Sequence, residues 1–197
     1  MMAMLRLNVP SIFVYGGSIL PGVFHGKDVT VKDVFEAVGQ HAAGNCPLQE
    51  LIALEKVACP GHGACGGQFT ANTMACVGEA IGLSLPNSNM APAPYKSREE
   101  VSVAAGEQVM ELLARNLRPR DICTRAAFEN AARVVAATGG STNAALHLPA
   151  MASEAGIEFD LFDVAEIFKS TPYIADLQPG GQYVAKDMHD AGGVYMV

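Results

Sequence analysis

The chain has 197 residues, of which half are hydrophobic and 17% are charged, so we expect a sizeable buried core. Its net charge is −7 and lysines and arginines form no cluster, which argues against a nucleic-acid surface. No apolar stretch approaches the roughly 20 residues of a membrane span, and the first residues do not resemble a signal peptide.

Two apolar segments predict short strands of one sheet. They are "SIFVYGG" (11–17), which ends in Gly-Gly, and "YIADL" (173–177). Between them, apolar residues at helical spacing predict helices at 30–44, 47–58, 70–85, 97–116, 124–140, 141–156 and 160–170, and a short helix near the end of the chain. Helix dominates, and the strands favour an α/β layered sheet with flanking helices over a pure helical bundle.

Several helix ends are predicted from capping residues. Thr30 with Asp33, and Ser97 with Glu100, have the spacing of a helix start. Ser141 is a good residue to cap the helix that follows it, and Pro149 should kink or break that helix.

Both ends of the chain look internal to a larger protein. The opening "MMAMLRLNVP" resembles the last turns of a helix that runs into a strand, and the chain stops soon after Gly192 and Gly193. Neither end carries a polar tail. We expect a piece of a longer protein.

The five cysteines include one in an unusual setting. Without a secretion signal, an odd number of cysteines indicates a reducing compartment, so we expect the cytoplasm. Cys46, Cys76 and Cys123 are interpreted as small buried hydrophobic residues. Cys65 lies among small residues just before a helix, a position that lowers a thiol pKa and leaves the sulfur accessible.

Cys59 and Cys65 have five residues between them, which is not the spacing of a thioredoxin-like pair or a zinc knuckle. His62 lies between them and could be a ligand, whereas the remaining histidines carry no spacing signal. One thiolate cannot hold an iron–sulfur cluster, which needs three or four ligands. If Cys65 is a ligand, its partners are distant in sequence or outside this chain.

Two glycine-containing segments are weaker candidates. "TGGSTN" (138–143) suits an anion at a helix start, but an ordinary turn between helices is the favoured interpretation, because such turns are common. "YGGSILPG" (15–22) follows a predicted strand, where ligands of α/β proteins often bind, yet it is not a dinucleotide-binding pattern.

The stretch "ACPGHGACGGQFTANTMACVGEAIGLSLPNS" resembles the dihydroxy-acid and phosphogluconate dehydratase family. The segments "RLNVPSIFVYGGSILPG", "ENAARVVAATGGSTNAALHLPAMASEAGI" and "PYIADLQPGGQYVAKDMHDAGGV" fit the same family in the same order. The resemblance covers essentially the whole chain. It implies that residues 1–197 form part of an amino-terminal cluster-binding domain, without the carboxyl-terminal domain.

The resemblance also implies the cofactors. In the family, three cysteines hold an iron–sulfur cluster of the 2Fe-2S or 4Fe-4S type, and the one in the glycine-rich segment corresponds to Cys65, not Cys59. Another lies in a Cys-Asp-Lys stretch whose Asp and modified Lys hold Mg²⁺, which we expect just before Met1. The remaining magnesium-binding Glu and the catalytic Ser lie in the carboxyl-terminal domain, so no catalytic residue is expected in this chain.

The implied reaction is a hydro-lyase reaction in branched-chain amino acid synthesis, the dehydration of a 2,3-dihydroxy acid to a 2-keto acid. The resemblance implies a homodimer for the full-length enzyme and inactivity for this chain alone. Two alternatives stay open: a sugar-acid dehydratase of the phosphogluconate type, and a non-catalytic truncated module.

We also expect unburied apolar surface, because short strands and their helices need neighbours to cover them. Cys65 should lie at an edge of the fold, near the end of the first predicted strand at Gly16 and Gly17.

Overall fold

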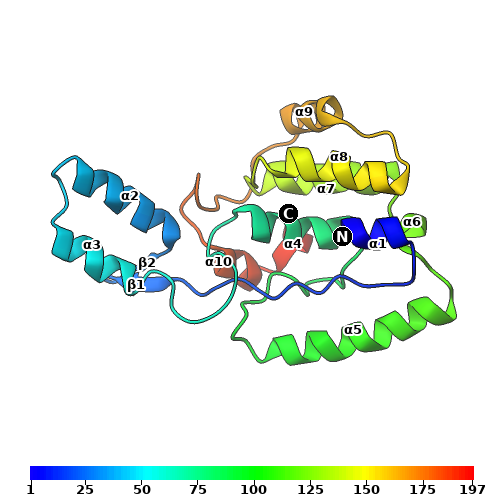
Figure 1. Cartoon of the computed structure of the whole chain (residues 1–197), viewed down its shortest axis with the longest axis horizontal. Helices are drawn as coiled ribbons and strands as arrows, with labels where there is room; N and C mark the ends of the chain where they lie inside the picture. Colours follow the sequence, from blue (N-terminus) through cyan, green and yellow to red (C-terminus); the bar gives the residue numbers. More distant parts are fainter.

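The protein is mostly helical (Figure 1), as seen in a computed structural model that describes residues 1–197. Its helices are α1 (Met2–Leu7), α2 (Val31–Ala42), α3 (Leu48–Glu55), α4 (Thr70–Ala80), α5 (Ser97–Ala114), α6 (Pro119–Ile122), α7 (Arg125–Ala137), α8 (Ala144–Ala155), α9 (Leu161–Ser170) and α10 (Ala185–Asp190), followed by the 3₁₀ turn η1 (Gly193–Met196). None of them is both long enough and apolar enough to cross a membrane.

The core forms where α4 packs against α7 and α8, with α1 against α8 and α9 against α7. It contains 15 buried residues, of which Phe128 on α7 is among the largest fully buried side chains. The small residues Ala131 and Ala132 let the helices approach closely. In Figure 1, α7 and α8 lie on one side of α4 and α5 lies on the other.

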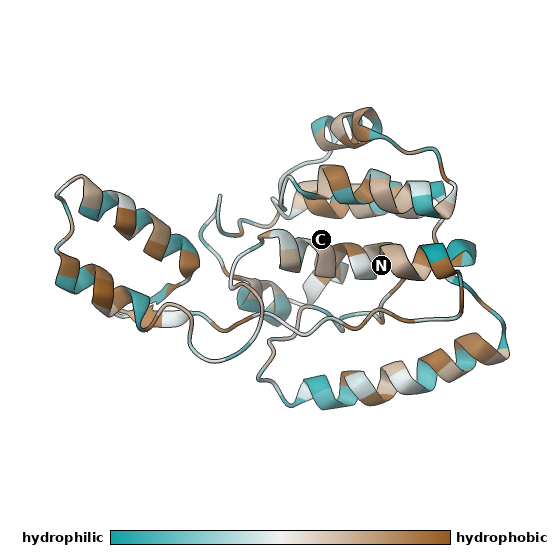
Figure 2. Cartoon of the chain, in the orientation of Figure 1, coloured by the Kyte–Doolittle hydropathy of each residue, from teal (hydrophilic) through white to brown (hydrophobic).

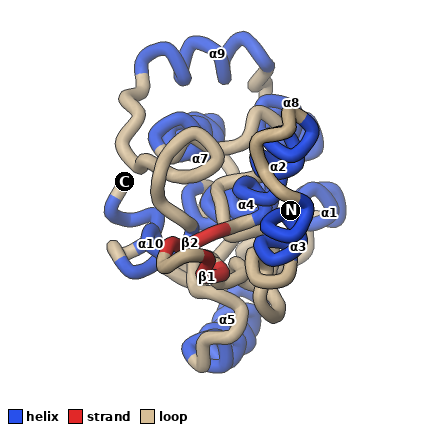
Figure 3. The backbone as a smooth tube through the Cα atoms, turned by 90° about the vertical axis from the view of Figure 1, so that its left-hand side faces the viewer, coloured by secondary structure: helices blue, strands red, loops and turns tan.

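The predicted layered sheet is wrong. The structure has only a two-stranded antiparallel hairpin, β1 (Gly22–Phe24) with β2 (Lys27–Val29), which Figure 3 shows among helices and loops. His25 and Gly26 join the strands, both with positive φ, as a tight hairpin turn requires. The architecture is therefore helical with one small hairpin.

Neither predicted strand forms. Residues 11–17 belong to no strand, and their backbone bonds go elsewhere: Phe13 donates to the carbonyl of Leu83 at 2.7 Å, and Tyr15 to the Asn89 side chain at 3.3 Å. Residues 173–177 make one isolated bridge, from Leu177 to Tyr183. Leu177 and Ala175 of this segment pack against residues of α4 and α10, which explains an apolar sequence pattern that resembles a strand without any sheet.

The capping residues predicted from the sequence are confirmed at some helix starts and not at others. The Thr30–Asp33 capping box is present at the start of α2. At α5 the helix is confirmed, but its Ser97 hydroxyl has no partner and caps nothing. α8 begins at Ala144 rather than after Ser141, and the helix continues through Pro149.

Much apolar surface is exposed. α2 and α3 stand apart from the core at one end of the molecule, and α5 makes little contact with the other helices (Figures 1 and 2). Side chains on α5 such as Val103, Met110 and Leu113 are more than half exposed. The accessible surface is 10030 Å², against roughly 8,900 Å² for a compact monomer of this mass. The expected unburied apolar faces are confirmed.

Candidate functional site

The Cys65 loop connects α3 to α4 and packs against the extended amino-terminal segment. The Ala64 amide donates to the carbonyl of Gly17 at 2.9 Å, and on the other side of that segment Ala93 donates to Ser18 at 2.8 Å. Cys65 is half-buried. The expected neighbourhood of Cys65 and Gly17, at an edge rather than in a closed core, is confirmed.

The glycines of this loop allow close approach. Gly63 has φ +131°, and a methyl carbon there would lie 2.5 Å from both the Ile19 nitrogen and the Ser18 oxygen. A methyl carbon on Gly66 would lie 3.0 Å from the Thr30 side chain. The small residues around Cys65 therefore allow the loop to pack closely against Ser18, Ile19 and Thr30, and they also leave the Cys65 side chain partly accessible.

Burial raises the pKa of the Cys65 thiol above its usual range, while the backbone N–H groups of Gly67 and Gly66 lower it and the nearby Cys59 raises it slightly. The prediction of a lowered pKa is wrong for the protein without a bound ion, because desolvation outweighs the two N–H groups. These N–H groups nevertheless favour a charged sulfur, which a metal would also stabilise.

A cavity of about 270 Å³ opens beside Cys65. Its lining is mostly apolar and includes Ile19, Thr30, Val31 and Ala58, together with Cys59. Cys59 is exposed, as is His62, which does not line the cavity. Sequence reasoning missed Thr30 here, because its contact with Gly66 joins residues far apart in the chain.

The donor set fits one ligand of a cluster but not a complete metal site. Nowhere in the protein do three His, Cys, Asp or Glu side chains come together in a way that could hold a metal ion. Cys65 has an accessible side, space beside it and N–H groups near its sulfur. The residues present therefore fit a single thiolate donor.

The other cysteines behave mostly as expected. Cys76 and Cys123 are buried, and burial raises the pKa of each thiol to about 12. The Cys76 sulfur accepts a hydrogen bond from Gln68 at 3.2 Å and contacts the Met90 sulfur at 3.4 Å. Cys46 is only partly buried, so its interpretation as a core residue is wrong.

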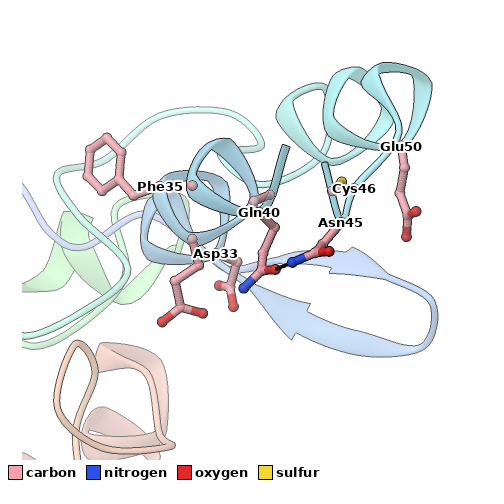
Figure 4. Close-up of a pocket in the computed structure, with 9 residues that line it drawn as sticks. Asp33, Phe35, Gln40, Asn45, Cys46 and Glu50 are labelled. Atoms are coloured by element: carbon pink, nitrogen blue, oxygen red, sulfur yellow. Dashed lines mark hydrogen bonds between the residues drawn. The ribbon is translucent and has the colours of Figure 1, made fainter. Parts of the chain in front are cut away.

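Two other places lack the features of the Cys65 loop. A cavity of about 510 Å³ lies between α2 and α3, and Figure 4 shows Asp33 and Glu50 at separate parts of it; Cys65 is not among its lining residues. At residues 138–143 the chain makes a turn from α7 to α8, where the Asn143 amide donates to Ser141 Oγ at 3.2 Å and its side chain donates to Thr70 at 2.8 Å. These polar groups satisfy one another, as in an ordinary turn.

The chain is similar to known proteins over its whole length. Residues 1–197 match the family described as Dihydroxy-acid/6-phosphogluconate dehydratase N-terminal. The chain belongs to this dehydratase family. It is 74% identical to a dihydroxy-acid dehydratase of Parvibaculum lavamentivorans, 69% to one of Pelagibacter ubique and 68% to one of Dinoroseobacter shibae, each over all 197 residues. It spans about a third of the length of these curated relatives, 34% of each.

Proposed function

We propose that the chain is the cluster-binding part of an iron–sulfur dihydroxy-acid dehydratase, a hydro-lyase that converts 2,3-dihydroxy acids to 2-keto acids in branched-chain amino acid biosynthesis. The observation that carries the proposal is the Cys65 loop, a glycine-rich turn whose half-buried cysteine lines an open cavity. Relatives at 68–74% identity that bear the dihydroxy-acid dehydratase name support the substrate class.

In this proposal Cys65 is one thiolate ligand of the cluster. When bound, the cluster supplies a Lewis acid that assists departure of the C3 hydroxyl, and Mg²⁺ supplies charge that holds the carboxylate and C2 hydroxyl. The chain's own part is to hold the sulfur at the cavity and to direct the N–H groups of Gly66 and Gly67 toward it. The apolar residues beside Cys65, such as Ile19 and Val31, limit the entry of water around the ligand.

The remaining assignments follow from the same reasoning. The magnesium ligands and the catalytic base belong to regions outside residues 1–197, so this chain contributes Cys65 and no catalytic residue. The complete enzyme is a homodimer in the cytoplasm, and the exposed apolar side chains of α2, α3 and α5 supply surface for a second domain or subunit.

A sugar-acid dehydratase is the second candidate, because the matching family description also covers 6-phosphogluconate dehydratase. The names of the curated relatives favour dihydroxy acids. Comparing turnover of dihydroxyisovalerate with that of 6-phosphogluconate by the full-length protein separates the two, and a preference for 6-phosphogluconate would overturn the substrate assignment.

The cluster assignment is tested in the full-length protein that carries this sequence. Cys65→Ser should abolish both the cluster absorbance and the dehydratase activity. The matched control Cys76→Ala should keep most of both, since Cys76 is buried against Gln68 and Met90. An equal loss on Cys59→Ala would mean that the wrong cysteine of the pair has been assigned.

The isolated 197-residue chain should not dehydrate dihydroxyisovalerate even after cluster reconstitution, because it holds no complete metal site. Turnover by this chain would contradict the non-catalytic role assigned to it. A non-catalytic module is the remaining alternative, and it requires that the full-length protein also be inactive.

A further inference from the structure

Three successive peptide groups shape the loop that carries Cys65, and each carbonyl is bonded on one side. The Asn72 side chain amide donates to the Cys65 carbonyl at 2.6 Å and to the Gly67 carbonyl at 2.7 Å. The backbone N–H of Ala185 donates to the Gly66 carbonyl, which lies between them, at 2.7 Å. All the carbonyls of this turn are therefore accounted for.

Fixing a carbonyl also fixes the N–H of the same peptide, because the peptide group is planar and trans and its two polar atoms point in opposite directions. The Cys65 carbonyl shares a peptide with the Gly66 N–H, and the Gly66 carbonyl shares one with the Gly67 N–H. The Asn72 and Ala185 bonds thus set the directions of the two N–H groups that lie near the Cys65 sulfur.

Asn72 is itself held in place. It is 1% exposed, on the first turn of α4, and its oxygen accepts a hydrogen bond from the Tyr15 hydroxyl at 2.9 Å. The two carbonyls identify the nitrogen of the Asn72 amide, because a carbonyl oxygen only accepts, and this leaves the amide oxygen to accept from the Tyr15 hydroxyl. Burial, together with the nearby thiols of Cys65 and Cys76, raises the pKa of Tyr15 above its usual range and keeps its hydroxyl a donor.

We propose that Asn72, oriented by Tyr15, is a positioning residue that aims the backbone N–H groups of Gly66 and Gly67 at the cluster sulfur ligand Cys65. The proposal rests on the proposed function, in which Cys65 binds the cluster. Hydrogen bonds to a ligating sulfur stabilise the reduced, more negative cluster and hold the ligand in one orientation. Asn72 and Tyr15 act through the loop and touch no substrate.

The test uses the full-length protein reconstituted with iron and sulfide. Three variants probe the network: Asn72→Ala removes it, Asn72→Asp keeps the size and an acceptor oxygen but loses the two donors, and Tyr15→Phe removes one hydroxyl. The control is Cys123→Ala. Cys123 is also fully buried, but it packs in the main core rather than against Tyr15, Asn72 or the Cys65 loop.

Two readouts report on the cluster without reference to activity: its reduction potential and the rate at which a chelator removes its iron. Both Asn72 variants should lower the potential and release iron about 10-fold faster, the size expected for loss of a residue that supports a ligand. Tyr15→Phe should change the potential and the iron-release rate in the same direction, but less than the Asn72 variants do. Because it removes only one hydroxyl, it keeps the test valid if the Asn72 variants fail to fold. Cys123→Ala should leave both readouts near those of the unmodified protein.

The outcomes separate this proposal from the one on which it rests. A cluster that survives Cys65→Ser overturns the proposed function. If Cys65 is required but neither Asn72→Asp nor Tyr15→Phe moves the potential or the iron-release rate beyond the control, the positioning role is wrong.

Discussion

Replacement of Gly63 by alanine tests the contact between the cysteine loop and the amino-terminal segment. Gly63 has φ +131°, a region open almost only to glycine, so alanine is strained there by about 2 kcal/mol. Its new methyl would lie 2.5 Å from the backbone of Ser18 and Ile19, and relieving that overlap costs about 2 kcal/mol more. The shift would also stretch the 2.9 Å bond from Ala64 to Gly17, a further loss of about 1 kcal/mol.

We therefore expect Gly63→Ala to lower the free energy of unfolding by about 5 kcal/mol, or the melting temperature by about 15 °C for a chain of this length. Gly61→Ala is the matched control, because Gly61 also has a positive φ, +87°, but nothing lies within 4 Å of the added methyl. It should cost about 2 kcal/mol. Gly16→Ala, with open space, should be neutral or slightly stabilising.

Thermal unfolding of the 197-residue chain, followed by circular dichroism, measures all three substitutions. If Gly63→Ala and Gly61→Ala are equally destabilising, the loop does not press against Ser18 and Ile19, and the placement of Cys65 beside that segment is refuted.

Further expectations concern the core, the pH dependence and the surface. Phe128→Ala should cost about 4 kcal/mol in urea unfolding, because Phe128 is fully buried in the main core, whereas Cys76→Ala deletes a methyl-sized group and should cost about 1 kcal/mol. Burial raises the pKa of Glu79 from 4.5, against the backbone N–H groups of Asn89, Asn87 and Met90, so the folded state holds this proton more tightly. Its contribution to stability is then complete below pH 4.5 and is lost as pH rises through the raised pKa. Glu79→Gln should therefore flatten the fall in unfolding free energy above pH 4.5. The isolated chain should bind a hydrophobic dye, and lysines at Val103, Met110 and Leu113 should reduce that binding; unchanged fluorescence would mean that α5 is not the exposed apolar face.

Helices could be predicted from sequence better than strands in this protein. A capping box and an apolar face are local features, so α2 was predicted with its cap at Thr30. Residues 11–17 have the composition of a strand, but whether they pair depends on distant partners, and here Leu83 and Asn89 provide the bonds instead. The hairpin at 22–29 was missed. The dipeptide His25-Gly26, with glycine at the second turn position, is a weak turn signal, and the strand after it, Lys27–Val29, has no apolar alternation.

For the site, sequence indicated Cys65 and its glycines but not the residues that hold them. Tyr15 and Ala185 lie 50 and 120 positions from Cys65, so no spacing rule connects them. Asn72 is close in sequence, yet an asparagine in a helical stretch carries no sign that it bonds back to the preceding loop. The lowered thiol pKa was also predicted from sequence position alone, and burial, which reverses it, depends on the folded chain.

The Cys65 turn is fastened by residues from both ends of the chain, which has a consequence for the order of folding. Its bonds to Gly17, Gln178 and Ala185 each close a long loop of chain, and such contacts carry an entropic cost that local helices do not. We expect helices such as α4 and α7 to form early and the cysteine turn to acquire its shape among the last events. Delivery of the proposed cluster to Cys65 would then follow folding rather than guide it, unlike zinc fingers, which fold only around their ion.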